Sequence, residues 1–188
     1  MSDKSSCDDA RSKSDGRGLV TIFTGDGKGK TTAAIGTAIR IAGHGLRVLI
    51  VFFAKSDRYP RGEDRALCRL HGITVTGCHH KGWIKKGKIK AEDKELAESA
   101  LAAAREAMLN GRYDLIVLDE INIAINFGLV GIDEVIGFIN DKPYNVELIL
   151  TGRYAKPKLI KMADLVTEMH MVKHPYGKGV KACQGIDY

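Results

Sequence analysis

The stretch Val20-Thr21-Ile22-Phe23, followed directly by Thr24-Gly25-Asp26-Gly27-Lys28-Gly29-Lys30-Thr31-Thr32, decides how this chain folds. The β-branched and aromatic residues 20–23 predict a buried strand, and apolar residues recur at helical spacing after residue 32. A glycine-rich loop between a strand and a helix, ending in Gly-Lys-Thr, is typical of phosphate-binding loops. The sequence therefore predicts a phosphate site at residues 24–32.

The residue types in this loop are each suited to binding phosphate. Gly25, Gly27 and Gly29 lack Cβ atoms, so the backbone can curl with its N–H groups pointing inward, at the positive end of the following helix. We expect Lys30, a catalytic residue, to lie charged and solvated at the mouth of the loop, and Thr31 to be a ligand of Mg²⁺ or Mn²⁺. The predicted nucleotide-binding residues of the loop are Gly25, Asp26, Gly27, Lys28, Gly29, Lys30, Thr31 and Thr32.

The loop departs from the common pattern G-x-x-x-x-G-K-S/T at one position. Counting back from Gly29, Thr24 stands where the first glycine is usual, and Lys28 is an additional cation. An ordinary glycine-rich turn is the alternative interpretation. The strand before the loop and the helix after it favour the phosphate site.

Composition and charge indicate the class of protein. The 188 residues are 44% hydrophobic and 28% charged, as is usual for a soluble globular chain. No apolar run approaches the roughly 20 residues that span a bilayer, and residues 1–17 lack the apolar core of a secretory signal. We therefore expect a cytoplasmic protein with no membrane partner. The net charge of +6 suits a phosphate-rich ligand.

The same charge would also suit nucleic acid. Residues 81–90 hold five lysines, which form either a solvated basic loop or a surface for nucleic acid. We favour the solvated loop and expect no nucleic-acid partner.

The four cysteines include no Cys-x-x-Cys pair, which favours reduced thiols. One group of residues could be arranged around a zinc ion, because thiolates and imidazoles are zinc ligands. Its spacing fits no standard zinc motif, so metal binding there stays an open alternative. The group consists of Cys68, His71, Cys78, His79 and His80.

The order of predicted elements indicates an α/β domain at 18–188, preceded by a mobile tail at 1–17 that has four acids, four bases and almost nothing to bury. Strands and helices alternate from Leu19 onward. Such alternation predicts a three-layer, P-loop nucleotidase-like fold, with a mostly parallel sheet and helices on both faces. The expected strands are 20–23, 47–53, 73–76, 115–118, 146–150 and 165–171, and the expected helices are 31–42, 63–70, 91–110, 132–139 and 158–163.

In parallel sheets, ligands bind beyond the carboxyl ends of the strands. Asp119 and Glu120 follow the apolar strand 115–118, where a metal ion on Thr31 would need a carboxylate. Glu120 is therefore predicted as the second catalytic residue and second metal ligand. Arg153, after strand 146–150, either reaches phosphate or lies in an exposed turn.

Two further polar residues have open roles. Asn122 and Asn126 either line a second pocket or lie on a helix surface. No serine, cysteine or histidine stands in a recognisable nucleophilic triad pattern.

Further segments match a known family when they are taken together with residues 24–34. They are 37–45, Gly62-Glu63, Val117-Leu118-Asp119-Glu120, Thr151-Gly152-Arg153, Val172-Lys173-His174, Gly179-Val180-Lys181-Ala182 and Gly185-Ile186-Asp187-Tyr188. In these segments the chain resembles the ATP:corrinoid adenosyltransferases, the cob(I)alamin adenosyltransferases with a P-loop. The family often has asparagine at the position of Asp26, and it can carry an aromatic residue at the position of Lys81.

The resemblance implies a reaction in which the Co(I) corrinoid attacks the 5′ carbon of ATP and triphosphate leaves. ATP would lie reversed in the loop, so that its ribose faces the corrinoid. Trp83 would contact the corrinoid or, alternatively, anchor a lid, and Arg40 would reach nucleotide within or across a homodimer interface. A flavoprotein would supply the electrons that reduce cobalamin or a corrinoid precursor.

Two other functions fit the loop without the resemblance. One is a P-loop ATPase or small-molecule kinase of another kind, and the other is a non-catalytic module that binds nucleotide or nucleic acid. The product formed from ATP distinguishes the three functions. An adenosyltransferase releases triphosphate, an ATPase or kinase releases ADP, and a binding module forms no product.

Overall fold

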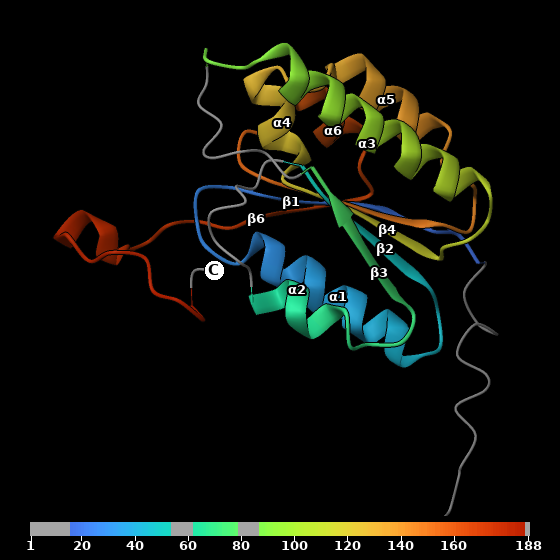
Figure 1. Ribbon diagram of the computed structural model, residues 1–188, viewed down its shortest axis with the longest axis horizontal. Helices are drawn as coiled ribbons and strands as arrows, with labels where there is room; N and C mark the ends of the chain where they lie inside the picture. Colours follow the sequence, from blue (N-terminus) through green and yellow to red (C-terminus); the bar gives the residue numbers. More distant parts are fainter. Residues whose placement is uncertain (1–15, 54–61, 79–86, 187–188) are drawn as a thin grey trace, which may run out of the picture.

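The computed structural model describes residues 16–53, 62–78 and 87–186. Its centre is a six-stranded sheet with the order β3-β2-β4-β5-β1-β6, and all its pairings are parallel (Figure 1). The strands are β1 (Val20–Thr24), β2 (Val48–Phe52), β3 (Ile73–Gly77), β4 (Leu115–Asp119), β5 (Glu147–Thr151) and β6 (Leu165–Glu168). The helices are α1 (Lys30–Gly43), α2 (Gly62–Leu67), α3 (Ala91–Leu109), α4 (Ile121–Phe127), α5 (Ile132–Asn140), α6 (Pro157–Met162) and the 3₁₀ turn η1 (Pro175–Lys178).

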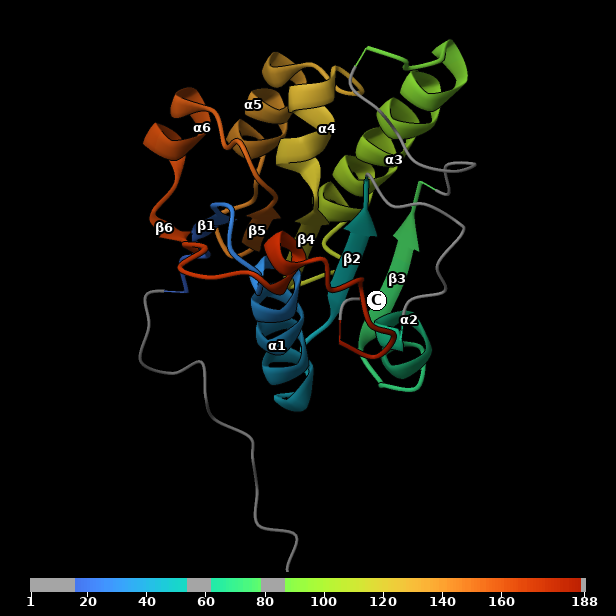
Figure 2. The same cartoon turned by 90° about the vertical axis from the view of Figure 1, so that its left-hand side faces the viewer.

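The helices form a layer on each face of the sheet. Helices α1 and α2 cover one face, and α3, α4, α5 and α6 cover the other (Figures 1 and 2). Strands β2 and β4 are therefore buried at every position, which explains why their sequences are continuous apolar runs rather than alternating ones. The predicted three-layer α/β fold is confirmed.

Helix α4 was not expected from the sequence. Its seven residues are too few to show a helical period, and they follow the apolar strand β4 almost without a break. Two residues in the left-handed region bound it: Glu120 at its start, with φ of 61°, and Gly128 at its end, with φ of 79°. The turn at Glu120 sends the chain from the tip of β4 directly onto the face of the sheet.

The prediction that the last strand runs to Met171 was wrong, because β6 ends at Glu168. The next residue turns onto the glycine-rich loop: the N–H of Met169 donates to the Thr24 carbonyl at 2.9 Å, and its carbonyl accepts from the N–H of Gly27 at 2.6 Å. The sequence showed the apolar run but not this contact. The segment after β6 also holds η1, which no periodicity indicated.

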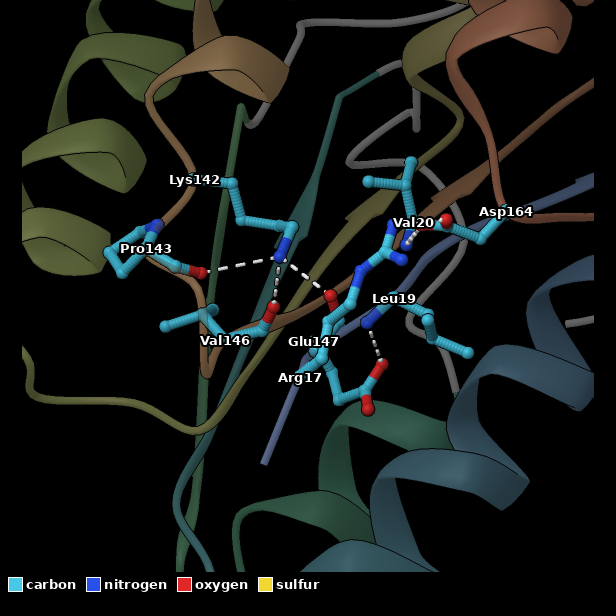
Figure 3. Close-up of polar contacts among 9 residues, drawn as sticks. Arg17, Leu19, Val20, Lys142, Pro143, Val146, Glu147 and Asp164 are labelled. Atoms are coloured by element: carbon cyan, nitrogen blue, oxygen red, sulfur yellow. Dashed lines mark hydrogen bonds and ion pairs between the residues drawn. The ribbon is translucent and has the colours of Figure 1, made fainter. Parts of the chain in front are cut away.

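The beginning of the domain is fixed by a half-buried lysine, Lys142, between α5 and β5 (Figure 3). Lys142 Nζ donates to the carbonyls of Gly18, Pro143 and Val146 at 2.8, 3.2 and 2.9 Å, and burial lowers its pKa. Arg17 forms an ion pair with Asp164 at 2.7 Å. These contacts hold β1 between β5 and β6, as the second strand from one end of the sheet.

None of the helices within 16–53, 62–78 and 87–186 has the length and apolar character needed to cross a bilayer.

Candidate functional site

A cavity of about 820 Å³ lies at the carboxyl edge of the sheet. It brings together the glycine-rich loop, the start of α1, the residue after β4 and the turn after β5, as expected for a parallel sheet. Its size is within the usual range for a small-molecule site. Its lining residues are Asp26, Gly27, Lys28, Gly29, Lys30, Thr31, Thr32, Ile35, Gly62, Glu63, Glu120, Ile123, Arg153, His174, Gly185 and Ile186.

Nearly all of the predicted loop residues line this cavity, with Gly25 as the exception. Helix α1 begins at Lys30, and Gly29 precedes it with φ of 119°, a conformation that favours glycine. The first backbone N–H groups of a helix have no partner within the helix, so this end of α1 is suited to an anion. Thr31 and Thr32 add hydroxyl groups beside it.

Lys30 does not lie solvated at the mouth of the loop, as the sequence analysis expected. Its side chain is only 8% exposed, and Nζ donates to the carbonyls of Gly25 and Gly27 at 2.8 and 2.7 Å. Burial lowers its pKa, while the negative charge of Glu120 acts in the opposite direction. The lysine therefore folds back into the loop, and an anion in the cavity would have to compete with these carbonyls.

The glycines of the loop are needed for a contact that the sequence did not show. A Cβ atom at Gly25 would lie 2.4 Å from the Met169 carbonyl oxygen, and one at Gly27 would lie 2.7 Å from it. At Gly29 a Cβ atom would meet the Met169 sulfur at 3.1 Å. The segment after β6 therefore packs directly on the outside of the loop, and Gly25 faces this segment rather than the cavity.

The two acids at the end of β4, Asp119 and Glu120, are positioned by Thr151. Its hydroxyl donates to Asp119 Oδ1 at 2.7 Å and accepts from the Glu120 N–H at 2.9 Å. Asp119 and Thr151 are fully buried, whereas Glu120 is half-buried and lines the cavity. Gly152 packs against Glu120, because a Cβ atom there would lie 3.1 Å from Glu120 Oε2. Glu120 thus occupies a fixed place opposite the loop.

The structure also places the three residues whose roles the sequence left open, Arg153, Asn122 and Asn126. Arg153 is exposed and lines the cavity, and its positive charge is among the causes that lower the pKa of Lys30 after burial. Asn122 is buried in α4, where its amide donates to the Gly152 carbonyl at 3.3 Å. Asn126 accepts a hydrogen bond from Lys156 at 3.2 Å, and neither asparagine lines the cavity.

Among the described residues, Arg40 is predicted for the site but does not line the cavity. Arg40 is exposed in the last turn of α1, ten residues after Lys30 and so about 15 Å further along the helix axis. Trp83 and Lys81 lie outside the described residues.

The Cys/His group is not assembled either, as far as its described members show. Cys68 is exposed next to Leu67, which packs on the α1 side of the sheet, while Cys78 is buried on the opposite side. Burial raises the pKa of the Cys78 thiol to about 11, so it is protonated at neutral pH. No group of three or more potential ligands occurs in the described part of the chain, and His79 and His80 fall outside it.

Several lining residues had no role assigned from the sequence. Glu63, His174, Gly185 and Ile186 belong to segments that carried the family resemblance. That resemblance was the feature of the sequence that could have indicated them as site residues. Ile35 and Ile123 looked like ordinary apolar positions of a helix.

Comparison with known proteins identifies this arrangement. Residues 16–188 match the family described as ATP:corrinoid adenosyltransferase BtuR/CobO/CobP. The chain belongs to this family. A corrinoid adenosyltransferase from Sinorhizobium sp. is 38% identical over 179 residues, covering 94% of this chain and 83% of the relative. Another from Escherichia coli is 36% identical over 174 residues, covering 93% and 87%. The adenosyltransferase is thus an enzyme of ATP:corrinoid adenosyl transfer in cobalamin synthesis.

Solved structures of low sequence identity share the fold of the adenosyltransferase. A KaiC-like protein from Pyrococcus horikoshii is 16% identical, with a TM-score of 0.54 over 81% of this chain and 73% of that chain. The flagellar accessory protein FlaH from Methanocaldococcus jannaschii is 13% identical, with a TM-score of 0.55 over 81% and 71%. At this identity the likeness concerns the fold alone.

Proposed function

We propose that the cavity binds ATP with its triphosphate on residues 24–32, and that triphosphate leaves as a whole when the 5′-deoxyadenosyl group is transferred to cobalt. The observation that carries this proposal is the meeting of Lys28, Lys30 and Arg153 with the first turn of α1 in one cavity. Cationic side chains and free backbone N–H groups together suit a polyphosphate.

The chemistry needs no protein nucleophile. The electron pair of the Co(I) corrinoid attacks C5′ of ATP, the C5′–O bond breaks, and its electron pair leaves on triphosphate while cobalt becomes Co(III). Lys28, Lys30 and Arg153 would stabilise the negative charge that develops on the leaving group. The loop and α1 would orient the nucleotide for attack.

The residues fit a Mg²⁺ or Mn²⁺ ion beside the phosphates. Thr31 and Glu120 both line the cavity and offer the oxygen ligands that these hard cations prefer. Magnesium is usually held by one or two carboxylates together with substrate phosphates, so a protein cage of three ligands is not required. When bound, the ion would neutralise charge on the triphosphate. Lys30 and Glu120 are proposed as the catalytic residues.

The remaining proposals concern partners. A homodimer would explain a nucleotide role for Arg40, which is exposed and far from the cavity of its own chain. We also propose a flavoprotein that reduces the corrinoid, and a cytoplasmic location, where thiols such as exposed Cys68 and Cys183 stay reduced.

Trp83 is proposed to contact the corrinoid and not ATP. Trp83→Ala should raise the KM for the corrinoid and leave the KM for ATP unchanged in steady-state assays. An unchanged KM for the corrinoid would favour a role of Trp83 in anchoring a lid.

A single-turnover reaction tests the proposed chemistry. The protein is mixed with Co(I)alamin, magnesium and ATP labelled in both its adenosine and phosphate groups. We expect triphosphate and a light-sensitive carbon–cobalt product in equal amounts. Recovery of ADP and phosphate in step with turnover would instead support an ATPase or kinase.

A further inference from the structure

The chain after β6 forms a strap, residues 169–186, that passes the N-terminal end of α1 (Figure 2). The strap begins at Met169, which is bonded to the glycine-rich loop through the carbonyl of Thr24 and the N–H of Gly27. Further along, His174, Gly185 and Ile186 line the same cavity as Lys30 and Glu120. The strap therefore starts on the outside of the loop and ends on its ligand side.

The strap contributes little to the core of the domain. Val172, Val180 and Ile186 are 96%, 54% and 69% exposed, although all three are apolar. The N–H of Val180 donates to the Pro175 carbonyl at 3.4 Å, and the N–H of Ile186 to the Cys183 carbonyl at 3.2 Å, so these bonds are local to the strap. An apolar side chain that is exposed at the wall of a charged cavity is suited to covering a ligand.

The cavity is not uniform in character. One part carries the cations and hydroxyls of the loop, which suit phosphate. Ile35, Ile123 and Ile186 add apolar surface from α1, α4 and the strap, three segments distant in the sequence. The nucleoside of ATP is joined to its phosphates by a single ester, so it lies next to the triphosphate when ATP is bound.

We propose that the strap is the wall of the site that holds the nucleoside of ATP, with Ile186 against it and His174 beside it. This inference rests on the proposed binding of triphosphate to the loop. The strap thereby gives the enzyme a preference for ATP over a bare polyphosphate. Because the strap is anchored on the loop at Met169, nucleoside and phosphates are held by one connected unit.

The test compares two ligands by calorimetry: ATP and inorganic triphosphate, each with magnesium. Three variants are used, namely a chain ending at Met171, the substitution Ile186→Ala, and the control Val180→Ala, which alters an exposed strap residue that does not line the cavity. Melting temperatures of all variants establish that the core is folded.

If the strap holds the nucleoside, the shortened chain and Ile186→Ala bind ATP at least about tenfold more weakly, while their affinity for triphosphate changes less than about twofold. Val180→Ala should bind both ligands as the parent does. Equal weakening of both ligands in Ile186→Ala would overturn the inference and give the strap a role in shaping the loop. Unchanged ATP affinity in the shortened chain would also overturn it.

The corrinoid is the competing occupant of this wall. Binding of Co(II)alamin to the ATP-loaded protein, followed by its spectrum, should be retained in Ile186→Ala at saturating ATP. Loss of corrinoid binding with normal ATP affinity would assign the wall to the corrinoid instead. A parent protein that binds neither ATP nor triphosphate would contradict the proposed function itself. A parent that binds both ligands, with variants that do not distinguish them, would contradict only the role of the strap.

Discussion

In Lys30, burial and the charge of a neighbouring acid act on the pKa in opposite directions. Burial lowers its pKa, and the carbonyls of Gly25 and Gly27 replace the water that the ammonium group has lost. Such an arrangement keeps the cation in place before the substrate arrives. An incoming triphosphate then finds the cation close by, but it must compete with these two carbonyls for the ammonium group.

Lys30→Ala should lower the kcat/KM for ATP by at least about a hundredfold, because it removes a charge that stabilises the leaving group. It should also destabilise the domain by about 1 kcal/mol, since two loop carbonyls lose their donor. Lys30→Gln is the matched control, because it keeps a donor but not the charge. It should recover stability in thermal melts without recovering turnover. Parent-like turnover in Lys30→Ala at subsaturating ATP would show that phosphate binds elsewhere.

Glu120 has an unusual backbone for its residue type. Its φ of 61° lies in the left-handed region, which disfavours residues other than glycine and asparagine. The Thr151 hydroxyl accepts from its N–H and holds this conformation. Strain of this kind persists where the surroundings enforce it, often at functional sites.

Glu120→Ala should therefore reduce kcat and change the dependence of the rate on magnesium concentration. Asp133→Ala is the comparison, because Asp133 is an exposed acid in the first turn of α5 and does not line the cavity. The rate of that variant should stay within about twofold of the parent, as is usual for an exposed residue outside the site. If both variants show the parent's rate and metal dependence, Glu120 is not a metal ligand.

At the scale of elements, the glycine-rich loop lies between α1 and the segment after β6. A phosphate loop is usually explained by the ligand that it surrounds. Here Gly25 and Gly27 are also required because Met169 packs on the loop from the outside. The loop conformation is therefore set jointly by β1, α1 and the start of the strap.

Gly27→Ala should raise the KM for ATP and lower kcat/KM by about a hundredfold, because its Cβ atom would lie 2.7 Å from the Met169 carbonyl oxygen and displace the loop. Gly36→Ala in α1 is the matched control. A Cβ atom there meets nothing within 4 Å, so the change should stabilise the helix by up to about 1 kcal/mol and leave the KM for ATP unchanged. Normal kinetics in Gly27→Ala would mean that the new Cβ atom displaces the strap at Met169 and leaves the loop in place.

At the scale of the whole molecule, the domain begins where the chain first meets the sheet. Gly18 lies so close to Val146 that a Cβ atom would be 2.1 Å from its carbonyl oxygen, and Lys142 bonds to the Gly18 carbonyl (Figure 3). Arg17 pairs with Asp164 nearer the surface. The segment just before β1 thus joins α5, β5 and β6.

Deleting residues 1–15 should leave the melting temperature within error, since the composition of this segment provides almost nothing to bury. Deleting residues 1–18 should lower it, because Lys142 then loses an acceptor for its charged group. For a chain of this size each kcal/mol corresponds to about 2–4 °C. A large loss of stability on removing 1–15 would mean that this segment packs permanently on the domain.

The sequence by itself determined the fold class and the place of the phosphate loop. Periodicity and apolar runs are local properties, so β1, α1, β4 and α3 were predicted close to their observed bounds. The loop motif and the acids at the end of β4 could also be found, because a parallel sheet brings its carboxyl ends to one edge. The family resemblance supplied the reaction.

Only the tertiary structure decided how these parts meet. The burial of Lys30 depends on carbonyls of its own loop, and the need for Gly25 and Gly27 depends on Met169, more than 140 residues away. Helix α4 was too short for its period to be visible, and the strap has no period at all. Contacts between segments distant in the sequence leave no local pattern, and in this chain those contacts shape the cavity.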